Sequence, residues 1–144
     1  MQANRRLWNK GRGAARVAAI TAALLATTGG AVAQDVPREV TRGDGLEVTL
    51  HRHPGLAAED RDMLQALAAQ PAALAGLLGA SGFAAIALAP AEGMIRDGVP
   101  ADSATAIGQL PDAATARAAA LEGCTAARRS GPACVVVLEV APLR

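Results

Sequence analysis

The sequence predicts an α+β fold: a small antiparallel or mixed sheet of about three strands, an alanine-rich helix packed across it, and a helical segment before it. Two short apolar runs, 83–89 and 134–140, have the length of buried strands, and an alanine-rich stretch over 112–128 has the length of a helix. Because both runs are too apolar to face water, we expect the two strands to be neighbours with the helix covering them.

Residues 1–33 contain the three regions of a cleavable signal peptide in the usual sequence. Five basic residues without any acid precede an uncharged stretch over 17–26, and Ala31, Val32 and Ala33 form a small-residue cleavage site before Gln34. The apolar part is about 10 residues long, whereas a membrane-spanning helix needs roughly 20. We therefore expect a periplasmic or secreted protein that begins at Gln34; the general secretory and twin-arginine routes both remain open.

The composition after the leader excludes several classes of function. Of the 14 basic residues, 5 lie in the leader. The remaining 9 are all arginine, and with 13 acidic residues they give the mature chain a net charge of about −4. Tyr is absent and Phe83 is the sole aromatic residue after Trp8, so neither charge nor stacking favours a nucleic-acid partner. No Lys follows Lys10, which excludes chemistry through a lysine Schiff base.

The N-terminal part of the mature chain predicts a loose arm over 34–55 that contains one short strand, 46–50. A single small α+β domain then spans 56–144. Its first helix is expected over 56–70, where acidic residues crowd the first turns, and Pro71 opens a second short helix that ends near residue 78.

The uncharged segment 72–89 is long enough to be compared with a membrane span. It consists mostly of alanine, with glycines at its middle, so its transfer into a bilayer is close to neutral. A span is therefore disfavoured, and a helix end, a Gly-Ser-Gly turn and the strand 83–89 are expected instead. A turn over 90–93 closes that strand, and a second strand is expected near 104–107.

The helix over 112–128 is the most strongly indicated element. Asp112 is a plausible N-cap, and Arg128 and Arg129 suit the C-terminal end of the helix dipole. Its apolar face is expected to consist of small side chains at helical spacing: Ala114, Ala118, Leu121 and Cys124. Glycine and proline over 130–132 end the helix, and the β-branched run that follows is typical of a central strand.

Two cysteines, Cys124 and Cys134, are the clearest chemical feature. In an oxidising compartment they predict a structural disulfide that closes a loop of about 11 residues, worth roughly 2.8 kcal/mol in the loop-entropy model. A redox role is the alternative. It is disfavoured because the spacing is not C-x-x-C and only Arg128 and Arg129 lie nearby to lower a thiol pKa.

Two histidines, His51 and His53, lie at a spacing that places both rings on one face of a strand, as a zinc or copper site requires. The third ligand could come from the following helix, which carries Glu59, Asp60 and Asp62. No serine has the sequence context of a hydrolase nucleophile. Two hypotheses follow: a non-catalytic, cofactor-free module that binds a protein or small ligand, and a metal-binding or hydrolytic protein centred on these histidines.

The second half of the chain resembles a group of small secreted bacterial proteins of unknown function. The resemblance rests on four segments that run from Phe83 to Pro142: Phe-x-Ala-Ile-Ala at 83–87, Pro-x-Glu-Gly at 90–93, the alanine-rich helix that leads to Cys124, and Cys-Val-Val-Val at 134–137. Some members bear the name aminolevulinate synthase. Such an enzyme resembles a much larger pyridoxal-phosphate fold with a cofactor lysine, so the resemblance does not imply that activity here.

Overall fold

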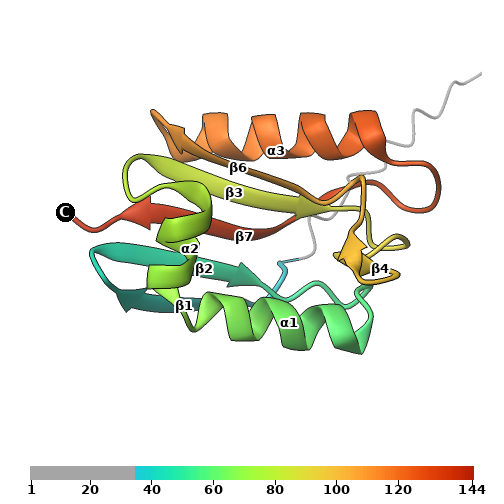
Figure 1. Ribbon diagram of the computed structural model, residues 1–144, viewed down its shortest axis with the longest axis horizontal. Coiled ribbons are helices and arrows are strands. Elements are labelled where there is room, and N and C mark those ends of the chain that lie inside the picture. Colours follow the sequence, from blue (N-terminus) through green and yellow to red (C-terminus); the bar gives the residue numbers. More distant parts are fainter. Residues whose placement is uncertain (1–34) are drawn as a thin grey trace, which may run out of the picture. The chain divides into compact units, whose positions relative to one another are not determined.

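A five-stranded antiparallel sheet with strand order β1-β2-β7-β3-β6 is the centre of the protein, and a second, two-stranded sheet pairs β4 with β5 (Figure 1). The computed structural model describes residues 35–144, so the signal peptide predicted over 1–33 lies outside the described residues. The elements are β1 (Arg38–Gly43), β2 (Leu46–His51), α1 (Ala58–Ala68), α2 (Pro71–Leu78), β3 (Phe83–Leu88), β4 (Ile95–Arg96), β5 (Val99–Pro100), β6 (Thr105–Leu110), α3 (Ala113–Ala127) and β7 (Val135–Pro142).

The prediction of a loose arm over 34–55 is wrong for residues 38–43, because they form β1, a strand of the main sheet. Asp44 and Gly45 both have positive φ, 52° and 77°, which is the backbone of a tight two-residue hairpin turn. This turn pairs β1 with β2 in the register Gly43↔Leu46. The polar composition concealed the strand because β1 lies at the edge of the sheet, where charged side chains remain in water.

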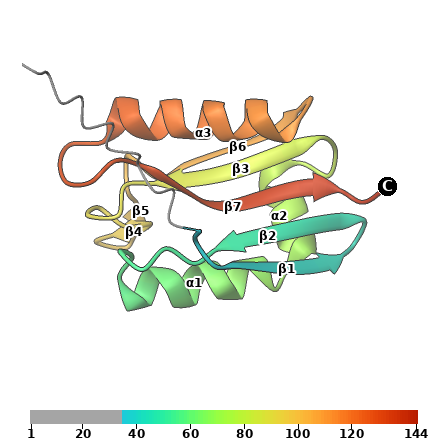
Figure 2. The same cartoon turned by 180° about the vertical axis from the view of Figure 1, so that it is seen from behind.

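The strand β7 lies at the middle of the sheet, between β2 and β3, as the view from behind also shows (Figure 2). The predicted neighbourhood of the two apolar strands is therefore confirmed, with Ile86 opposite Leu138. The sheet is larger than the predicted three strands. The strand expected near 104–107 extends over β6 to Leu110, and the β4–β5 hairpin was not foreseen.

Helices cover the two faces of the sheet unequally. The helices α1 and α2 close the larger core against one face, and α3 closes a smaller core against β3, β6 and β7 on the other. The larger core is built mainly from branched aliphatic side chains: Leu46, Val48, Leu50, Leu56, Leu64, Leu74, Leu78, Ile86, Leu88, Val137, Leu138 and Val140. The smaller core is built almost wholly from alanine and cysteine: Ala85, Ala87, Ala89, Ala116, Ala120 and Cys124.

The buried face of α3 differs from the predicted one. Asp112 caps the helix as expected, accepting the Thr115 backbone N–H at 2.8 Å, and Cys124 is fully buried. The alanines beside Cys124 in the core are Ala116 and Ala120, and the predicted Ala114 and Ala118 are exposed. Because alanine occupies almost every turn of this helix, its sequence cannot distinguish one face from the next.

The segment 72–89 is divided between a helix and a strand, as predicted. The turn over 79–82 separates α2 from β3. None of the helices within residues 35–144 has both the length and the apolar character needed to cross a membrane.

Candidate functional site

A pocket of about 340 Å³ lies between the β4–β5 hairpin and the loop that follows α3. Figure 1 places the hairpin and this loop at the same end of the sheet. We call it the hairpin pocket, and its lining is mostly charged or small: Glu92, Arg96, Asp97, Val99, Pro100, Ala101, Asp102, Arg129 and Ser130. A second, much smaller hollow of about 20 Å³ beside α1 is too small to hold more than a water molecule.

One wall of the hairpin pocket is the β4–β5 hairpin, which a buried carboxylate anchors. Asp97 and Gly98 form its tip with φ of 53° and 80°, the Asp-Gly signature of a tight hairpin turn. At its base the Ala101 N–H donates to the Met94 carbonyl oxygen at 2.9 Å. The Met94 N–H in turn donates to the carboxylate of Asp60, a buried residue of α1, at 2.9 Å. The hairpin is thereby tied to the main body of the fold.

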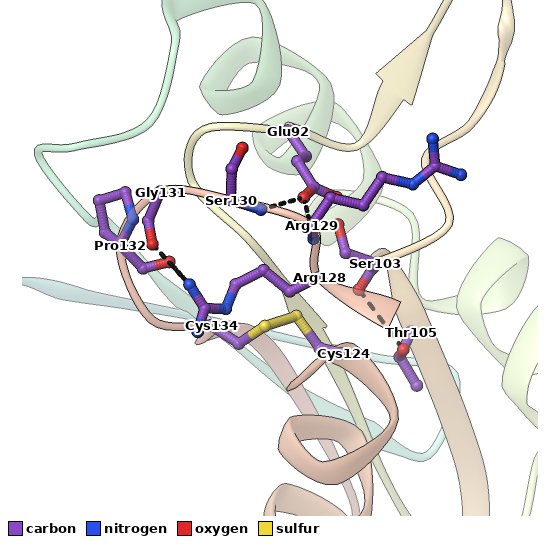
Figure 3. The surroundings of a disulfide bond; sticks show 10 residues. All are labelled: Glu92, Ser103, Thr105, Cys124, Arg128, Arg129, Ser130, Gly131, Pro132 and Cys134. Carbon is purple, nitrogen blue, oxygen red and sulfur yellow. Dashed lines mark hydrogen bonds between the residues drawn. A yellow bond between two sulfur atoms is a disulfide. The ribbon is translucent and has the colours of Figure 1, made fainter. Parts of the chain in front are cut away.

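The opposite wall is the loop 128–134, which is fixed by a carboxylate and a disulfide (Figure 3). Glu92 Oε1 accepts the backbone N–H groups of Arg129 and Ser130 at 2.6 and 3.2 Å. The Cys124–Cys134 disulfide, with a Cα–Cα distance of 6.2 Å, closes the loop at its base. The disulfide predicted from the sequence is therefore confirmed, and it also holds one wall of the pocket.

The Glu92 carboxylate is stabilised in its ionised form. The buried Ser103 hydroxyl is the main influence that lowers the pKa of Glu92 from its ordinary 4.5. The Arg129 N–H lowers this pKa further. Because the charged form of Glu92 accepts two amides of the loop, the loop keeps its conformation at neutral pH.

Both signs of charge meet in the hairpin pocket. The guanidinium of Arg129 forms an ion pair with the Asp102 carboxylate across the pocket, and both side chains are largely exposed, at 77% and 64%. The guanidinium of Arg96 donates to the Ala91 carbonyl oxygen at 3.1 Å. Three carboxylates and two guanidinium groups line the pocket, so the lining carries a net charge of −1.

The two histidines of the metal hypothesis bind protein groups. His51 Nε2 lies 2.5 Å from a carboxylate oxygen of Glu139 on β7, and His53 Nε2 lies 2.7 Å from the Val136 carbonyl oxygen. The two ring centroids are 6.3 Å apart. The hydrogen bond from His51 is the main cause that lowers the pKa of Glu139 from 4.5, and the charge of Arg117 adds to it.

The candidate third ligands lie on α1 and do not complete a metal site. Asp60 holds the hairpin through Met94, while Glu59 and Asp62 are exposed. Within residues 35–144 no three His, Cys, Asp or Glu side chains form a group that could hold a metal ion. The sequence did not indicate Glu139 as the partner of His51, because 88 residues separate the two and only the pairing of β2 with β7 brings them together.

Sequence reasoning also missed the hairpin pocket. Arg129 was considered as a helix-end charge and as a neighbour of the cysteines, and Glu92 as part of a turn, so neither suggested a shared site. The Asp97-Gly98 pair was the one available signal, since it is typical of a hairpin. Comparison of the chain with protein families, with curated proteins and with solved structures finds no match.

Proposed function

We propose that the protein is an exported, non-catalytic binding module whose ligand site is the hairpin pocket. The observation that carries this proposal is the fixation of both walls by contacts within the protein itself: Asp60 anchors the hairpin, and Glu92 together with the disulfide anchors the loop. A pocket whose walls are already ordered loses little conformational entropy when a ligand enters. Its volume of about 340 Å³ lies at the lower end of small-molecule sites, which suits a small ligand.

Export is supported by two independent features. The pattern over 1–33 is that of a signal peptide, and disulfides such as the one between Cys124 and Cys134 persist mainly in oxidising compartments. The resemblance of the second half to small secreted bacterial proteins agrees with the same location. A periplasmic or secreted site of action follows.

The groups that line the hairpin pocket also hold its walls in place. The Glu92 carboxylate, which lines the pocket, is already occupied by two backbone amides. The pocket groups are therefore arranged to hold a ligand.

A nuclear magnetic resonance titration of the exported protein tests the proposal. The ¹⁵N-labelled protein is titrated with the low-molecular-mass fraction of the medium in which the host grows. We expect shifts of backbone amides in 92–102 and 128–131. Asp60→Asn, which weakens the hold on the hairpin, should reduce these shifts, while Asp62→Asn, an exposed neighbour on the same helix, should not. Shifts confined to other regions, or no shifts, would refute the proposed site.

A further inference from the structure

We propose that the hairpin pocket binds a small zwitterion that carries one ammonium and one carboxylate group, which inserts between Arg129 and Asp102. A free α-amino acid and a short peptide with free termini share this chemistry. The inference rests on the proposed function of the pocket and adds the class of ligand.

The charges of the pocket disfavour ligands of a single sign. A simple anion would meet the guanidinium groups of Arg96 and Arg129 but also three carboxylates, on Glu92, Asp97 and Asp102. A simple cation would face the opposite conflict. A zwitterion is neutral overall, so it leaves the net charge of the site unchanged, and it offers an acceptor to Arg129 and a donor to Asp102.

The ion pair between Arg129 and Asp102 can be exchanged at low cost. Pairs between exposed side chains contribute little because water and salt screen them, and both members of this pair are more than half exposed. A zwitterion replaces the one pair by two: its carboxylate accepts from Arg129, and its ammonium donates to Asp102. Arg129 and Asp102 each keep a partner of opposite charge in the complex.

The backbone around the ion pair is firmer than the pair itself. The amide of Arg129 is held by Glu92 at 2.6 Å, and the Ala101 amide beside Asp102 is held by Met94 at 2.9 Å. The two side chains can therefore separate while their anchor points stay in place. The adjoining apolar wall of Val99, Pro100 and Ala101 offers a surface for the uncharged part of the ligand.

The test compares ligands that differ only in their charged groups. Glycine, L-leucine and L-alanyl-L-alanine are the zwitterions, N-acetylglycine presents the carboxylate alone, and glycinamide presents the ammonium alone. Binding to the exported protein is followed by calorimetry and by the amide shifts of 96–102 and 128–131. We expect saturable binding of the zwitterions and at least about ten-fold weaker binding of the other two, since each lacks one charge-assisted hydrogen bond. The relative affinities of L-leucine and the dipeptide distinguish the two sources.

Variants test whether the ion pair is the recognition element. Arg129→Gln and Asp102→Asn should each weaken zwitterion binding by about ten-fold or more. Arg52→Gln is the matched control, because it removes an exposed ion pair with Glu39 that lies outside the pocket, and it should leave the affinity unchanged.

The outcomes separate this inference from the proposed function. Equal binding of N-acetylglycine or glycinamide, or zwitterion binding that survives both pocket variants, would overturn the zwitterion inference. If the fraction of the medium shifts the pocket amides while no zwitterion does, the pocket remains a binding site and only the ligand class is wrong. If neither the fraction nor any member of the panel shifts these amides, both proposals fail.

Discussion

Removal of the Cys124–Cys134 disulfide should lower both the stability of the domain and the order of the pocket. The cysteines are 10 residues apart, so the bond closes an 11-residue loop and contributes about 2.8 kcal/mol in the loop-entropy model. That is a large share of the roughly 5–15 kcal/mol by which a domain of this kind is stable. For a domain of about 110 residues we expect the melting temperature to fall by about 10 °C or more on reduction.

The assay separates the crosslink from the packing of the sulfur atoms. Thermal unfolding is followed with and without reductant for the natural protein and for a Cys124→Ala, Cys134→Ala double variant. Reductant should destabilise the natural protein and leave the variant unchanged, so the difference isolates the crosslink. The variant should be less stable than the oxidised protein because Cys124 is fully buried in the alanine core. Two titratable thiols in the folded, oxidised protein, or equal melting temperatures with and without reductant, would refute the reasoning.

Three further predictions concern packing, pH and processing. Gly108→Ala should lower the free energy of unfolding by about 3 kcal/mol in chemical denaturation, because a Cβ there would lie 2.0 Å from the Leu78 carbonyl oxygen. The control is Gly76→Ala in α2, where a Cβ would meet nothing within 4 Å; this variant should raise the free energy of unfolding by about 0.5–1 kcal/mol. The pKa of Glu139 is lowered, so its ionised form stabilises the fold above pH 4.5, and this contribution disappears as the pH falls below that value. Glu139→Gln should therefore have a lower melting temperature at pH 7, and its melting temperature should decrease less in acid than that of the natural protein. Intact mass of protein exported by its natural host should correspond to a chain that begins at Gln34, and an unprocessed cytoplasmic product would contradict the leader.

Particular elements show how far the sequence reaches. The helix α3 and the strands β3 and β7 were predictable because each is a local pattern of apolar residues bounded by a cap, a glycine or a proline. The strand β1 was not, because an edge strand needs no apolar run and is defined by its partner. The alanine-rich face of α3 was misplaced by two residues, since alanine alone does not mark which side of a helix is buried.

The candidate site divides in the same way. The sequence alone determined the disulfide that the structure contains, because this bond depends on which residues are present and how near they are along the chain. Only the tertiary structure decided that Glu92 holds the loop at Arg129, 37 residues away, and that Glu139 pairs with His51 across 88 residues. Such contacts depend on strand order and register. Many distant pairings are compatible with one pattern of apolar residues, and the burial of the whole core selects among them.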